Sequence, residues 1–77
     1  MNNNEKYAVK IMWLKKYLTA NVIILWSDHT WEEVCISQHH GCYEMQGRIN
    51  MRHIVDKKLS RTDSLKYIEE QIRELGL

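Results

Sequence analysis

The last quarter of the chain carries the pattern that limits the possible folds most strongly. Apolar residues recur there at intervals of three and four positions: Leu65, Ile68, Ile72 and Leu75. This spacing places them along one face of a helix. Thr62 or Asp63 can cap the start of that helix, and Gly76 follows its last turn. We therefore predict a helix over about 63–75, with one apolar face that packs against a sheet.

An alternating segment, residues 43–52, lies upstream of this helix and predicts a strand. Its apolar positions are Tyr43, Met45, Ile49 and Met51. Its polar positions are Glu44, Gln46, Arg48, Asn50 and Arg52. A period of two puts the two sets on opposite faces of a strand. Gly47 interrupts the apolar side and marks either a bulge or a turn that splits the run into a hairpin. A second strand, buried on both faces, is expected at 22–26, which is apolar throughout.

Two further segments fit either a helix or a strand. Residues 5–20 contain apolar residues at helical spacing, namely Tyr7, Ile11, Leu14 and Leu18. The same segment contains an alternation typical of a strand, formed by Tyr7, Val9, Ile11 and Trp13. Residues 31–40 follow a capping box that begins at Thr30, which favours a helix, but they can also pair with 22–26 across the turn 27–30. We favour the helix over the strand for both segments.

Length and composition predict one ordinary globular domain. Seventy-seven residues bury a thin core, and 44% hydrophobic with 27% charged residues argue against disorder. We expect a single α+β domain over 1–77, in which a small single-layer antiparallel sheet packs against the C-terminal helix. Residues 1–4 are expected to form a disordered tail.

The longest apolar runs, residues 11–14 and 22–26, are far shorter than a membrane span. The first six residues lack the basic region and the uninterrupted apolar stretch of a signal peptide. We therefore expect a cytoplasmic protein that has no membrane partner and keeps its cysteines reduced.

A cluster of thiols and imidazoles is the only candidate for metal chemistry. Cys35, His39 and Cys42 are ligand types that zinc prefers, and Cys35 and His39 would share one face if 31–40 were helical. The spacing matches no common zinc module, and no C-x-x-C pair is present. We expect no metal and no cofactor. Phosphate-binding loops and hydrolase motifs are also absent from the sequence, so we expect a protein without enzymatic activity.

Charge is arranged in blocks that sum to +3 over 1–20, −4 over 21–47, +4 over 48–61 and −2 over 62–77. The basic block suggests a nucleic-acid-binding domain that uses one strand face and the connection after it, through Arg48, Arg52, Lys57, Lys58 and Arg61. This is the alternative interpretation.

The interpretation that we favour is a small regulatory or inhibitory accessory protein that binds another protein. The chain holds three Trp and four Tyr but no Phe, and Trp and Tyr suit half-buried binding surfaces. The predicted contact residues are Trp26, Trp31, Glu32 and Glu33. A homodimer is a further possible assembly.

Overall fold

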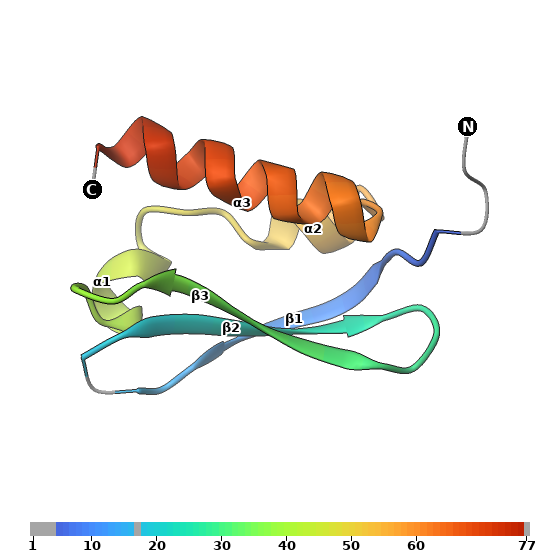
Figure 1. The fold of residues 1–77 in the computed structure, drawn as a ribbon, viewed down its shortest axis with the longest axis horizontal. Coiled ribbons are helices and arrows are strands. Elements are labelled where there is room, and N and C mark those ends of the chain that lie inside the picture. Colours follow the sequence, from blue (N-terminus) through green and yellow to red (C-terminus); the bar gives the residue numbers. More distant parts are fainter. Residues whose placement is uncertain (1–4, 17, 77) are drawn as a thin grey trace.

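The computed structural model describes residues 5–16 and 18–76. The described residues form a three-stranded antiparallel sheet and three helices, an α+β fold as predicted. The strands are β1 (Ala8–Leu14), β2 (Ala20–Trp26) and β3 (Trp31–Ser37). The helices are α1 (Cys42–Gln46), α2 (Arg52–Asp56) and α3 (Arg61–Leu75). All three helices lie on the same side of the sheet (Figure 1). The predicted disordered tail, residues 1–4, lies outside the described residues.

The sheet is a meander in the order β1-β2-β3, so β2 is its centre. Ile11 pairs with Ile24, and Ile24 with Glu32, which fixes the register of all three strands. The pairing shifts between Ala8 and Lys10 and again between Ala20 and Asn21. The turn between β2 and β3 is held by the Asp28 carboxylate, which accepts the backbone N–H of Thr30 at 3.1 Å. Such side-chain turns suit Asp.

The core lies between the sheet and the helices. Every second residue of β2 faces the helices and is almost fully buried: Ala20, Val22, Ile24 and Trp26. The helical half of the chain contributes Met45 from α1, Ile54 from α2 and Ile68 from α3. This layering leaves the residues between them on β2, such as Ile23 and Leu25, on the other face of the sheet.

The start of the described chain is joined to the start of α3. Tyr7 and Ser60 form an isolated bridge. The Ala8 N–H donates to Leu59 O at 3.0 Å, and the Arg61 N–H donates to Lys6 O at 3.0 Å. These bonds fix the N-terminal end of β1 against the N-terminal end of the helix.

The predicted C-terminal helix is confirmed. Its apolar stripe faces the sheet, with Ile68 at 2% exposure and Ile72 packed against the core. Ser60, not Thr62 or Asp63, is the N-cap, and its hydroxyl accepts the Asp63 N–H at 3.2 Å. Gly76 ends the helix in the left-handed conformation, φ 69°, where glycine is free of steric cost.

The preference for helices in 5–20 and 31–40 was wrong, because each segment forms a strand. In β1, Ile11 and Trp13 face the core while Met12 and Leu14 face the other side. Apolar residues on both faces of β1 produced the spurious helical spacing. In β3 the alternation was hidden by Glu32, an acidic residue on the core side, and Thr30 belongs to the hairpin turn rather than to a helix cap.

The strand predicted at 43–52 was also wrong. The segment folds as α1, a connection and the first turn of α2. The predicted burial of Met45, Ile49 and Met51 is correct, but Tyr43 is 73% exposed. Two helical pieces of five residues are too short to display a period of 3.6, so an alternation appeared instead.

None of the helices in the described part of the chain has the length and apolar character needed to cross a membrane.

Candidate functional site

The sheet has one face that no described helix covers, which we name the open face (Figure 1). Its members follow from the register, because residues paired across strands point to the same side. Lys10 pairs with Leu25, and Leu25 with Trp31, opposite to the core. The open face has three rows of three residues: Lys10, Leu25 and Trp31; Met12, Ile23 and Glu33; Leu14, Asn21 and Cys35.

Five of these nine side chains are large and apolar, and solvent reaches all of them. Trp31 is 48% exposed and Met12 is 41% exposed. Leu14, Ile23 and Leu25 are half-buried by their neighbours on the sheet. The solvent face of an antiparallel sheet ordinarily carries polar residues. This face therefore departs from the pattern expected of a surface that meets only water.

Charged groups lie on both sides of the apolar residues. Lys10 is exposed on β1, and Glu33 is exposed on β3. The Lys16 ammonium group donates to the Glu33 carboxylate at 2.9 Å, spanning the sheet from the end of β1 to β3. The open face thus combines an apolar centre with a mixed charged rim, the usual anatomy of a protein interface.

The four predicted partner-binding residues separate onto the two faces. Trp31 and Glu33 belong to the open face. Trp26 is 1% exposed, and its indole N–H donates to Glu32 at 3.0 Å. Arg61 donates to both oxygens of the same carboxylate at 2.8 Å. The Arg61 hydrogen bonds hold the pKa of Glu32 below its ordinary value, against the opposing effect of burial. Trp26 and Glu32 therefore stabilise the fold on the helical side.

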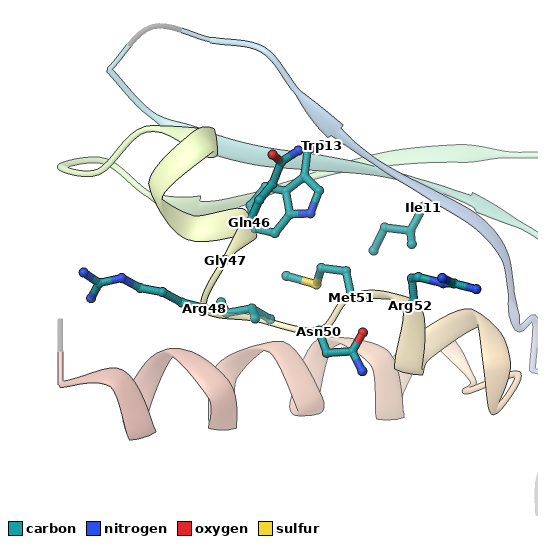
Figure 2. A pocket seen from close by; sticks show the side chains of 9 residues that line it. Ile11, Trp13, Gln46, Gly47, Arg48, Asn50, Met51 and Arg52 are labelled. Carbon is teal, nitrogen blue, oxygen red and sulfur yellow. The ribbon is translucent and has the colours of Figure 1, made fainter.

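The five predicted nucleic-acid-binding cations do not form a row on a strand. Arg61 is engaged by Glu32. Lys57 and Lys58 are exposed in the turn after α2. Arg48 follows α1 and Arg52 begins α2, and both line one groove of about 430 Å³. Its other wall is formed by Ile11 and Trp13 of β1 (Figure 2).

The three candidate metal ligands, from which no metal site was expected, lie apart in the structure. Cys35 is exposed on the open face, whereas Cys42 is buried in α1, and both thiols are free. His39 is exposed after the end of β3, so it does not share a helical turn with Cys35. Over residues 5–16 and 18–76, no group of three His, Cys, Asp or Glu side chains could hold a metal ion.

Sequence reasoning did not identify the contributions of β1. Met12 and Leu14 belong to the open face, and Ile11 and Trp13 line the groove. The alternation in 7–13 contained the necessary signal, but the competing helical spacing masked it.

No family model matches the chain, and no curated protein or solved structure shows significant similarity to it.

Proposed function

We propose that the protein is a small non-enzymatic regulator or inhibitor that acts by binding another protein through its open face. The observation that supports this proposal is the cluster of five apolar side chains, Met12, Leu14, Ile23, Leu25 and Trp31, on a sheet face that none of the described helices covers. Exposed apolar clusters with a polar rim mark interaction sites on small proteins.

The composition of the face favours a folded protein partner with an apolar patch of its own. Trp31 offers a large rigid side chain at the edge strand, and tryptophan is enriched among the residues that dominate binding energy. Lys10 and the Lys16–Glu33 pair place both signs of charge around it. Such a rim selects a partner by charge complementarity more than it adds affinity.

The experiment compares two exposed aromatic residues on different surfaces. The wild-type protein is used to capture binding proteins from extracts of its source cells, and the captured protein is then purified for titration calorimetry. Trp31→Lys is expected to weaken the measured affinity by about thirtyfold or more, as for a residue that dominates an interface.

Tyr43→Lys is the matched control, because Tyr43 is 73% exposed on α1, away from the sheet face. It should bind like the wild type. Equal binding by Trp31→Lys, or a loss caused by Tyr43→Lys alone, would contradict the proposal. Circular dichroism of both variants checks that the fold is kept.

A second copy of the chain could also cover the open face. Sedimentation of the purified protein tests this by measuring its oligomeric state. We expect a monomer at micromolar concentration. A dimer that Trp31→Lys dissociates would show that the open face binds its own copy, and the proposal of a separate protein partner would then be wrong.

A further inference from the structure

The groove between β1 and residues 46–52 is a second candidate site, independent of the open face. Ile11 and Trp13 form one wall, while Arg48 and Arg52 stand at opposite ends with Asn50 between them (Figure 2). The groove opens on the helical side of the sheet, because Ile11 and Trp13 pair with core residues of β2.

The groove is positively charged. Arg48 and Arg52 are exposed, and neither takes part in an ion pair among the described residues. No acidic residue lines the groove. An adjoining hollow, lined in part by Arg52, has Asp56 as its single acid. Two guanidinium groups at the ends of one hollow can each hold a phosphate.

The groove also offers an aromatic ring and an amide. Trp13 is half-buried, so one part of its indole remains accessible. Gln46 is exposed beside Trp13 and can reach the edge of a base, whereas the Asn50 amide points away from Trp13, toward α3 (Figure 2). A cationic groove with an aromatic platform is the arrangement that binds unpaired nucleotides.

The wall that carries the arginines is anchored. Ile49 and Met51 alternate with the polar residues and are buried at 3% and 4% exposure. The Tyr67 hydroxyl donates to Asn50 O at 3.1 Å, and the Tyr67 ring stacks on His53 with centroids 4.7 Å apart. The segment is therefore held in place before a ligand arrives, which reduces the entropic cost of binding.

We propose that this groove binds a short single-stranded segment of nucleic acid. A base stacks on Trp13, Arg48 and Arg52 contact phosphates on either side of it, and Gln46 lies within reach of the base edge. An acidic peptide would use the two arginines equally well. An acidic peptide would leave the Trp13 ring and the Gln46 amide without a function, so nucleic acid fits the groove better.

Fluorescence anisotropy with a labelled ten-nucleotide oligothymidylate tests the proposal. We expect a dissociation constant of about 1–100 µM at low salt, with a slope of log affinity against log salt of about −1.4 for two phosphate contacts on a single strand. Arg52→Gln should weaken binding and make the slope shallower by about 0.7. Trp13→Leu should weaken binding by about five- to a hundredfold with the slope unchanged.

Arg73→Gln is the matched control, because it removes the same charge from the exposed end of α3. It should bind the oligonucleotide like the wild type. Trp31→Lys should also bind normally, which separates this site from the open face. Because Trp13 packs partly against the core, thermal unfolding checks that Trp13→Leu is folded, and Arg52→Gln tests the groove if it is not.

Three results would overturn the proposal. The first is no binding of oligothymidylate at low salt. The second is equal weakening by Arg73→Gln and Arg52→Gln, which would indicate attraction to net charge alone. The third is tighter binding of a labelled oligoglutamate peptide that competes with oligothymidylate, which would assign the groove to an acidic peptide.

Discussion

Glu32 is the residue that joins the sheet, the core and the C-terminal helix. It lies on the core side of β3, where an acidic side chain is unfavourable unless its charge is satisfied. Both oxygens are satisfied by Arg61, and one of them also accepts the buried indole N–H of Trp26. These bonds explain why a glutamate occupies a position that an alternating strand would give to an apolar residue.

The lowered pKa of Glu32 predicts a loss of stability in acid. Its hydrogen bonds to Arg61, the main cause of the shift, favour the charged carboxylate in the folded state. The folded-state pKa is depressed, so this stabilisation is fully present above the ordinary value of 4.5 and is lost as the pH falls below it. Glu32→Gln should therefore lower the melting temperature at pH 7, and this penalty should shrink as the pH falls below 4.5.

Thermal unfolding of both proteins across pH 3–7 measures this effect. Glu33→Gln serves as the control, since Glu33 lies on the open face in a surface pair with Lys16. Surface pairs contribute little, so Glu33→Gln should shift the melting temperature less at every pH. A penalty for Glu32→Gln that is the same at pH 3 and pH 7 would contradict the assignment.

At the scale of elements, the sequence correctly predicted the helix and the strand whose apolar residues follow one clear pattern. Helix α3 has a single apolar stripe, and residues 22–26 of β2 are all apolar, so both elements were found, although Ile23 and Leu25 are half-buried and not fully buried as predicted. Strands β1 and β3 were misread because each breaks the alternation for a tertiary reason: an apolar outer face in β1 and the paired Glu32 in β3. Neither an apolar outer face nor an ion pair between distant residues can be recognised from one sequence.

The candidate site was predicted only in part, because its membership depends on the strand register, which the sequence alone did not provide. Trp31 and Glu33 were identified, but Met12 and Leu25 could be placed beside them only after the register was known. Arg48 and Arg52 were identified as a pair on a strand, and the structure brings them together on one groove by a different route.

The N-cap Ser60 fixes the start of α3, and removal of its side-chain hydroxyl tests this role. Ser60→Ala removes the acceptor for the Asp63 N–H and should cost about 0.5–2 kcal/mol of unfolding free energy, measured in urea. Ser60→Thr keeps the acceptor and should retain most of the stability. If alanine and threonine behave alike, the cap does not stabilise the helix.

At the scale of the whole molecule, the sheet carries apolar residues on both faces, but the helices described within 5–16 and 18–76 cover one face only. The helices bury the core on their side of the sheet, with Met45 at 0% exposure, while the open face leaves Met12 at 41%. A chain of 77 residues has enough helix to cover one face only. The second face of the three-stranded sheet therefore remains exposed to solvent.

Two methionines provide a matched comparison of these faces. Met45→Ala removes a fully buried side chain and should cost about 2–5 kcal/mol in urea unfolding. Met12→Ala makes the same change on the open face and should cost less than about 1 kcal/mol. A comparable cost at both positions would mean that the open face is covered in solution, and its availability to a partner would be refuted.

The bridge between Tyr7 and Ser60 has a consequence for the order in which the molecule assembles. The three strands are consecutive and joined by short connections, so their pairing closes only small loops. The bridge instead joins residues separated by most of the chain, so its loop-closure entropy exceeds that of either strand pairing in the sheet. The meander is therefore expected to form early in folding, and the attachment of α3 to the first strand completes the native state.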